Sequence, residues 1–230
     1  MTAPARPLAL IVGAGDGLSA SLARLLHAEG YAIALAARNI VKLDALVGEV
    51  EGWAHAADAA DPDQVAALFA ALPAAPEIVV YNASYRVRGP LVDLDPVEVR
   101  RALEVCAFGG FLVAQQAARV MLPRHRGAIV LTGASAGVKG YPRSAPFAMG
   151  KFALRGLAQS MARELHPQGL RVLHLVIDGG IRGARRPEPA DAPDSLLDPD
   201  AIARATLAAL RQDRSAWSWE IELRPWVETF

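Results

Sequence analysis

The sequence is almost without cysteine. Cys106 is the only one among 230 residues, so an intrachain disulfide is excluded. Neither paired cysteines nor a cluster of histidine and cysteine supplies the spacing of a metal site, and we expect no metal. A reducing, cytoplasmic environment is the expectation that follows.

An excess of charge of either sign is also missing. The chain has 24 Lys and Arg against 24 Asp and Glu, for a formal net charge of +0, and it contains no run of basic residues. Proteins that bind nucleic acid neutralise phosphates with a basic face, so we expect no nucleic-acid partner.

Signals for secretion or membrane insertion are the third absence. Residues 1–7 lack the apolar core of a signal peptide. We expect no apolar stretch that is both long enough and sufficiently free of charge to span a bilayer. We therefore expect a soluble protein with no membrane partner.

What the sequence has is apolar content, 53% hydrophobic against 21% charged residues. This is enough for one large core, and we expect a single domain over residues 1–230. The segment 8–31 organises the rest. Its unbroken apolar run at residues 8–12 predicts a strand buried on both faces, and an amphipathic helix follows a glycine cluster.

The glycine cluster between that strand and helix predicts a phosphate-binding turn. Gly13, Gly15 and Gly17 allow backbone amides to approach a ligand at a helix N-terminus. The strict dinucleotide pattern fails at Leu18, and the spacing from Gly13 to Gly17 fits better. A purely structural connector between strand and helix remains the alternative.

Buried strands and helices alternate through the rest of the chain. Strands are predicted at 31–37, 53–57, 77–81, 128–132, 170–177 and 218–223. Helices are predicted at 41–50, 63–72, 97–122, 147–165 and 201–212. The pattern predicts an α/β fold, a Rossmann-type doubly wound parallel sheet of about seven strands with helices on both faces and ligands at the carboxyl ends of the strands. Residues 182–199 are expected to form a mobile loop that selects the substrate.

The residues at these strand ends resemble the short-chain dehydrogenase/reductase family over essentially the whole chain. The matching motifs are Gly13 and Gly17 in the glycine loop, Asp58 after the third strand, Asn82-Ala83 after the fourth, and Lys151 in the helix after the fifth. The resemblance implies a small-molecule substrate and a homodimer or homotetramer formed through the helices at 97–122 and 147–165.

The resemblance also implies a dinucleotide cofactor. The turn from Gly13 to Leu18, with Gly15, Asp16 and Gly17 between them, would hold its phosphates. Asp58, Asn82 and Ala83 would lie against its adenosine part, Lys151 on the nicotinamide ribose, and the backbone of Ile181 on the carboxamide. A helix cap before Pro62 is the alternative for Asp58. A structural bridge between neighbouring strands is the alternative for Asn82.

Arg38, at the end of the second strand, bears on which dinucleotide is used. Its guanidinium could bind a 2′-phosphate, which favours NADP over NAD. Asp16 in the glycine loop opposes this by its negative charge, so NAD remains possible. The alternative for Arg38 is a solvated charge at a strand end.

Three of the four catalytic positions of the family depart from its pattern. Phe147 stands where the family has the proton-donating Tyr, Ala134 where it has Ser, and Cys106 where it has Asn; only Lys151 remains. A benzyl group has no proton to donate, and a general acid is worth roughly a hundred- to ten-thousand-fold in rate.

Other groups could supply the proton. Asp178 replaces the family's Pro after the sixth strand and could act as an acid, although Asp before two glycines is also an ordinary turn. Ser135 follows Ala134 by one residue, which on an extended strand turns it to the opposite face. The remaining hydroxyls at this edge are Thr132, Ser144, Tyr141 and Tyr85.

Three functions stay open. The first is an NADP-dependent oxidoreductase that transfers hydride to an activated double bond or iminium without the Tyr. The second is a catalytically silent NADP-binding sensor or partner subunit, and the third is a carbonyl reductase with a substitute donor.

Overall fold

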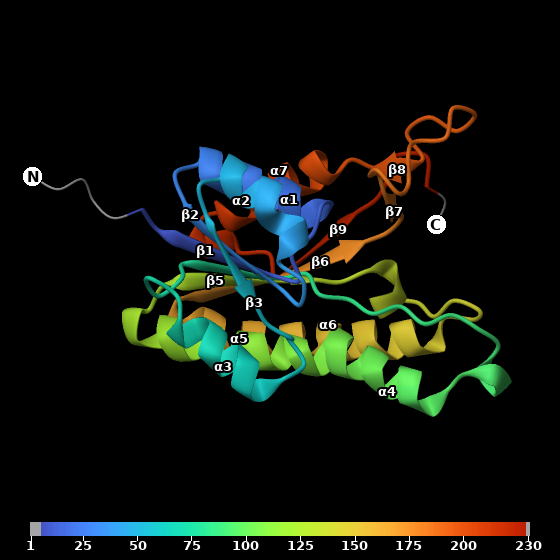
Figure 1. Cartoon of the computed structure of the whole chain (residues 1–230), viewed down its shortest axis with the longest axis horizontal. Helices are drawn as coiled ribbons and strands as arrows, with labels where there is room; N and C mark the ends of the chain where they lie inside the picture. Colours follow the sequence, from blue (N-terminus) through green and yellow to red (C-terminus); the bar gives the residue numbers. More distant parts are fainter. Residues whose placement is uncertain (1–5, 229–230) are drawn as a thin grey trace, which may run out of the picture.

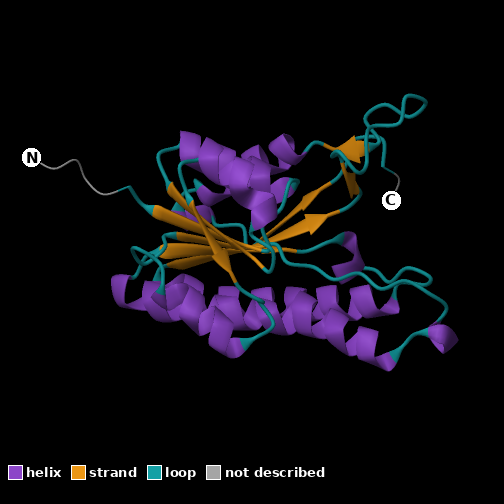
Figure 2. Cartoon of the chain, in the orientation of Figure 1, coloured by secondary structure: helices purple, strands orange, loops and turns teal. Residues whose placement is uncertain are grey.

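A parallel sheet of seven strands forms the centre of the protein. The computed structural model describes residues 6–228. The strand order is β3-β2-β1-β4-β5-β6-β9, and every neighbouring pair is parallel. Helices cover both faces of the sheet (Figure 1), and the three layers are plain when the chain is coloured by element type (Figure 2). The predicted doubly wound α/β fold is confirmed.

Most of the strands are apolar runs of the sequence, whereas the edge strand at Glu220–Leu223 alternates Glu with apolar residues. They are β1 (Leu8–Val12), β2 (Ala32–Ala37), β3 (Trp53–Ala56), β4 (Ile78–Tyr81), β5 (Gly127–Thr132), β6 (Leu170–Ile177) and β9 (Glu220–Leu223). All five residues of β1 and all eight of β6 are buried, as expected for strands covered on both faces. A separate pair, β7 (Gly180–Ile181) and β8 (Leu196–Leu197), closes the base of the 182–199 loop.

The helices occupy the connections between the strands. They are α1 (Leu18–Ala28), α2 (Asp44–Glu49), α3 (Pro62–Ala70), α4 (Pro96–Leu103), α5 (Gly109–Met121), α6 (Ala145–Leu165) and α7 (Pro199–Leu210). In Figure 1, α1, α2 and α7 lie on one side of the sheet and α3 to α6 on the other. Each face therefore has its own apolar core.

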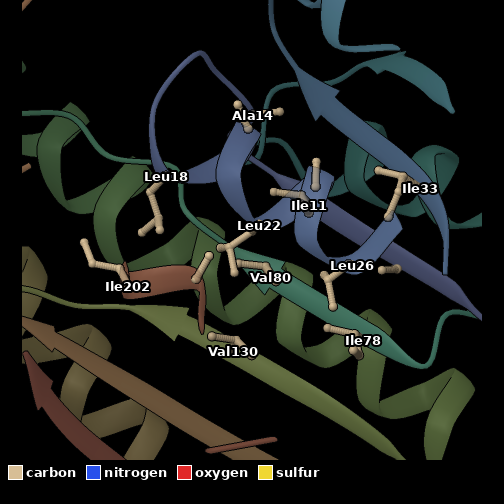
Figure 3. Close-up of a cluster of buried hydrophobic side chains, with 14 of the residues drawn as sticks. Ile11, Ala14, Leu18, Leu22, Leu26, Ile33, Ile78, Val80, Val130 and Ile202 are labelled. Carbon is tan, nitrogen blue, oxygen red and sulfur yellow. The ribbon is translucent and has the colours of Figure 1, made fainter. Parts of the chain in front are cut away.

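The core above the sheet shows why the segment 8–31 organises the fold. Leu18, Leu22 and Leu26 of α1 point onto the sheet beside Ile11 and Val80 (Figure 3). These three leucines are at most 4% exposed. Complete burial of such a side chain stabilises the folded state by about 1.5–3 kcal/mol, so this stripe fixes the helix and, with it, the glycine loop that precedes it.

The stretch Pro96–Arg124 corrects one expectation. By length and composition alone it could cross a membrane, so the prediction that the chain contains no such stretch is wrong. Half of its apolar window is buried inside the protein, where Val113, Ala117 and Met121 pack against the sheet. The core helix of a soluble protein passes the same test, and packing onto the sheet accounts for the buried half of the apolar residues.

The predicted connections differ from the structure at two places. Residues 82–95, for which the sequence predicts no element, form a second long connection whose only regular structure is a 3₁₀ turn at Leu91–Asp93. The predicted loop at 182–199 contains β8 and ends where Asp198 caps α7. Both connections follow the carboxyl ends of strands, so both reach the edge of the sheet where a ligand would bind.

Candidate functional site

The glycine loop after β1 is built for close approach of backbone. Gly13 has φ +82°, a conformation that favours glycine, and a Cβ there would overlap the backbone of Ala83. The amides of Gly13 and Ala14 both donate to the carbonyl of Ala36 on β2, at 2.9 and 3.0 Å. The first glycine is therefore required by the fold itself.

The later glycines of the loop have another environment. A Cβ on Gly17 would meet nothing within 4 Å, and one on Gly15 would meet only the Lys42 ammonium, at 4.0 Å. Asp16 between them is exposed, and Leu18 is buried as the first residue of α1. This part of the loop therefore offers open space in front of a helix N-terminus, which suits an anion.

Asn82 ties the end of β4 to the start of α1. Its Nδ2 donates to Ser19 Oγ at 2.8 Å, and that hydroxyl donates to the carbonyl of Gly13 at 3.3 Å. The structural alternative for Asn82 was a bridge between neighbouring strands. The side-chain hydrogen bond instead connects β4 to the helix that follows the glycine loop. The side chain thus holds the loop in place.

Asp58 does not cap a helix. Its Oδ1 accepts from the amide of Ala60 at 3.0 Å in a local turn. The N-cap of α3 is Asp61, which accepts from the amides of Asp63 and Gln64. The cap alternative for Asp58 is therefore wrong, because the helix begins at Pro62 and the residue directly before it takes the role.

Two cationic side chains follow β2. Arg38, directly after the strand, is exposed and forms no ion pair among the residues that the structure describes. Lys42, which the sequence reasoning missed, brings its ammonium toward Gly15 from the 3₁₀ turn Val41–Leu43. A Lys five residues beyond a strand carries no sequence signal of its own, since most such lysines are ordinary surface charges.

Lys151 lies in the interior, 3% exposed, on the second turn of α6. Its ammonium donates to the carbonyl of Thr132 at the end of β5, at 2.6 Å. Burial lowers the pKa of Lys151 from 10.5 to about 8, with the charge of Arg86 acting in the same direction and Cys106 against it. Such a group can hold ligand hydroxyls in a dry site and is sensitive to pH near neutrality.

Phe147 lies one turn before Lys151, and two cations lie near its ring. The Lys151 ammonium lies 5.7 Å from the ring centroid, and the Arg86 guanidinium 4.2 Å from it. The ring is 4% exposed and packs with Cys106 and Ala134 in one small cluster. The structure thus brings together all four residues that the resemblance aligns with catalytic positions.

Cys106 lies in a π-helical segment, Glu104–Phe108, between α4 and α5. The thiol is fully buried and donates to the carbonyl of Tyr85 at 3.3 Å. The irregular turn frees the carbonyl of Val105, which accepts from the buried hydroxyl of Tyr81. Packing and hydrogen bonds therefore account for this segment.

Asp178, after β6, is committed to two cations. Its carboxylate lies 3.7 Å from the Lys139 ammonium and 3.5 Å from the Arg224 guanidinium. It is 4% exposed, and a buried carboxylate needs such partners. Ion pairing accounts for its presence without a catalytic role.

Among the hydroxyls, Ser135 and Tyr141 form a pair inside the site. The Tyr141 hydroxyl donates to Ser135 Oγ at 3.1 Å, and a hydrogen bond with Tyr141 raises the pKa of Lys139 beside it. Ser135 begins a 3₁₀ turn, so both it and Ala134 line the same cavity. The expectation that Ser135 faces away is wrong, because β5 has already ended at Thr132.

The other hydroxyls are arranged differently. The Tyr85 hydroxyl donates to the carboxylate of Glu98 at 2.5 Å, away from the cavity. Thr132 Oγ1 is buried and has no hydrogen-bond partner within the described chain. Ser144 is buried at the start of α6 and lines the cavity without capping the helix through its side chain.

Many of these groups line one cavity of about 810 Å³ at the carboxyl edge of the sheet, among them Thr132, Ser135 and Tyr141. The volume suits a small organic molecule. Its walls include four predicted site residues, Asn82 after β4, Asp178 after β6, Ile181 of β7 and Lys151 of α6. Arginines from the two long connections line it as well. No group of three or more His, Cys, Asp or Glu side chains in residues 6–228 is arranged to hold a metal ion.

Known proteins match this chain over most of its length. The family model described as short chain dehydrogenase matches residues 7–184. An uncharacterised oxidoreductase of Staphylococcus aureus strain N315 is 27% identical, over 98% of this chain and 100% of its own. The crystal structure of a short-chain dehydrogenase from Rhodopseudomonas palustris is 34% identical, covers 97% of this chain and 100% of that one, and superposes with a TM-score of 0.85. A metagenomic short-chain oxidoreductase solved with NADP is 25% identical over 96% of this chain and 98% of its own, with a TM-score of 0.81.

Proposed function

Because the chain belongs to the short-chain dehydrogenase family, we propose that it is an NADP-dependent oxidoreductase acting on a small organic substrate. The observation that carries the proposal is the shared cavity, in which the buried Lys151 lies at the same sheet edge as Asn82 and Ile181. The cofactor, when bound, supplies the hydride. A relative of the same fold was solved with NADP.

The residues of this chain fit such a cofactor. The open space over Gly15 and Gly17 admits phosphate groups to backbone amides at the start of α1. In our proposal Asp58, Asn82 and Ala83 hold the adenosine part, Lys151 holds the ribose hydroxyls, and the backbone of Ile181 holds the carboxamide.

The choice of NADP over NAD rests on the cations after β2. Arg38 is exposed and the Lys42 ammonium approaches Gly15, so two positive charges are available for a 2′-phosphate. Their charge outweighs that of Asp16. We expect Arg38→Ala to weaken NADPH binding by about 1.5–3 kcal/mol, the range for a hydrogen bond to a charged group, and to leave NADH binding unchanged. Equal affinities of the wild-type protein for NADPH and NADH in calorimetric titrations would refute this.

In our proposal the reaction does not use a phenol at position 147. The side chain of Phe147 has no exchangeable proton, and the Arg86 guanidinium covers its ring. A substrate with an activated double bond or an iminium accepts hydride directly, and water closes the proton balance. If the substrate is a carbonyl compound, the Tyr141–Ser135 pair is the available donor in the same cavity. A silent binding protein is the alternative.

The assembly and the loop are further parts of the proposal. Phe108, Phe111, Met149 and Phe152 on α5, α6 and the segment before α5 are 40–49% exposed, which suits burial between copies of the chain. We propose that these helices form a homodimer or homotetramer. Residues 182–199 carry Arg186 into the cavity wall, and we propose that they open and close over the substrate.

Two measurements test the proposed function. Calorimetric titration shows whether NADPH binds, and the loss of reduced-nicotinamide absorbance shows whether it is consumed with a panel of enones, iminium salts, aldehydes and ketones. The proposal expects binding and consumption with at least one member. Binding without consumption over the whole panel would favour the silent alternative, and no binding would refute both.

A further inference from the structure

Arginine side chains outnumber carboxylates in the cavity. Five cationic residues line it, Arg86, Arg88, Arg143, Arg186 and Lys151, against two acidic ones, Asp178 and Glu228. Asp178 is already paired with Lys139 and Arg224. Within residues 6–228, no ion pair joins any of the four arginines to an acid. The cavity therefore has a surplus of positive charge on a protein whose formal net charge is +0.

Arg86 lies close enough to Arg88 and to Arg186 to be repelled by both. Desolvation lowers the pKa of Arg86, and the charges of Arg88 and Arg186 lower it further. They come from different connections, 82–95 after β4 and 182–199 after β7, which meet over the carboxyl edge of the sheet. Like charges held together without a counter-charge cost free energy, so an anionic ligand would be stabilised by all three.

Arg86 is positioned and not simply solvated. Its guanidinium stacks at 4.2 Å on the ring of Phe147, whose other cation neighbour is Lys151. Stacking on an aromatic face orients the planar group and leaves its edge free for bidentate hydrogen bonds to a carboxylate or phosphate. The anion would thus lie beside Phe147 and Lys151, at the end of the cavity where the family's chemistry takes place.

We propose that the substrate carries an anionic group, a carboxylate or a phosphate, and that Arg86, Arg88 and Arg186 bind it. This inference rests on the proposed function for the statement that the ligand is a substrate. The binding of an anion by the arginines does not depend on it. Arg86 has the central position, because the charges of Arg88 and Arg186 both act on it and because its guanidinium lies on the ring of Phe147.

Calorimetric titrations with three ligands of one ring size test the proposal. Benzoate and phenyl phosphate carry the anion, and benzyl alcohol is the neutral counterpart. At least one of the anions should bind the full-length wild-type protein ten or more times more tightly than benzyl alcohol, and added salt should weaken that binding. The tighter of the two anions identifies a carboxylate or a phosphate as the group recognised.

Arginine variants then locate the binding. Arg86→Gln should weaken binding of the anion by about tenfold to a hundredfold, which corresponds to the loss of a hydrogen bond to a charged group. Arg88→Gln and Arg186→Gln should weaken it in the same direction. Arg204→Gln is the matched control, because this exposed arginine lies on α7, away from the cavity. Circular dichroism on each variant verifies that it is folded.

The titrations with NADPH separate this proposal from the proposed function. Anion binding that is lost in Arg86→Gln while the affinity for NADPH is kept supports the proposal. Equal binding of benzyl alcohol, binding of neither anion, or equal losses in Arg86→Gln and Arg204→Gln overturns it. Equal losses of NADPH and anion affinity in Arg86→Gln also overturn it, because the arginines would then hold the cofactor phosphates. Failure of wild-type protein to bind NADPH refutes the proposed function alone.

Discussion

Replacing Lys151 by Met should change how stability depends on pH. The ammonium of Lys151 is buried on the carbonyl of Thr132, and its pKa falls from 10.5 to about 8. Because the folded pKa lies below the unfolded one, the folded protein binds fewer protons between about pH 8 and 10.5. The free energy of unfolding of the wild-type protein therefore rises with pH across this window.

The size of the effect follows from the lowered pKa. A fall from 10.5 to about 8 corresponds to about 3 kcal/mol. This is the stability missing well below pH 8, where the buried amine is charged, and recovered by about pH 10.5. About half of it is recovered between about pH 8 and 9.5, a range in which the protein can be handled. In Lys151→Met this contribution is absent.

Urea unfolding followed by circular dichroism at several pH values measures the difference. Other titrating groups are common to both proteins, so their contributions cancel when the two curves are subtracted. Lys42→Met is the matched control, since Lys42 is exposed and its removal should leave the pH dependence as in the wild type. If the Lys151→Met and wild-type curves run parallel from about pH 7 to 9.5, the amine is not buried as described.

Three further predictions use other parts of the structure. Gly13→Ala should destabilise the protein by at least about 1–3 kcal/mol in urea unfolding, because φ is +82° and a Cβ overlaps Ala83. Gly156→Ala, in open space on α6, should instead stabilise the protein by about 0.5–1 kcal/mol. Equal effects of the two substitutions on the free energy of unfolding would contradict this reasoning. His174 is buried, which lowers its pKa from 6.5 to about 4 despite Glu220, so stability should be lost as pH falls from about 6.5 to 4, by up to about 3 kcal/mol; a pH profile of His174→Asn unchanged from wild type would disprove this. Phe147→Tyr combined with Ala134→Ser should create slow ketone or aldehyde reduction, by adding a phenol beside Lys151 and a second donor, at least about a hundredfold above the wild type; a wild type that already reduces ketones as fast as the variant would show that the missing hydroxyl is not limiting.

The fold could be predicted because its signals are local. The apolar run of β6 was predicted with the observed limits, Leu170–Ile177, and β1 likewise, since a strand buried on both faces needs an unbroken run of apolar residues. The edge of the sheet that carries the site followed from the parallel topology. Asn82, Lys151 and Ile181 are far apart in the sequence, yet all line one cavity, because the carboxyl ends of parallel strands meet at one edge.

The charged part of the site could not be predicted in the same way. Arg86 and Arg186 are 100 positions apart in connections without periodicity, where an isolated arginine is most often a solvated charge. Only the path of the two connections brings both arginines into the wall of one cavity. His174 was hidden for a related reason: it lies within the apolar run of β6, and its partners Glu220 and, through Glu220, Arg155 come from β9 and α6. Tertiary contacts determine both sets.

Transfer of deuterium from the cofactor tests the central claim most directly. The wild-type protein is mixed with NADPH deuterated at the transferable position of its nicotinamide and with the member of the electrophile panel that is consumed fastest. The mass of the product is then measured by mass spectrometry. Hydride transfer predicts one deuterium on a product carbon, with Lys151→Met slowing the transfer. The panel includes compounds that carry a carboxylate or a phosphate. If the protein binds NADPH but yields no deuterated product from any member of the panel, the assignment as an oxidoreductase is contradicted.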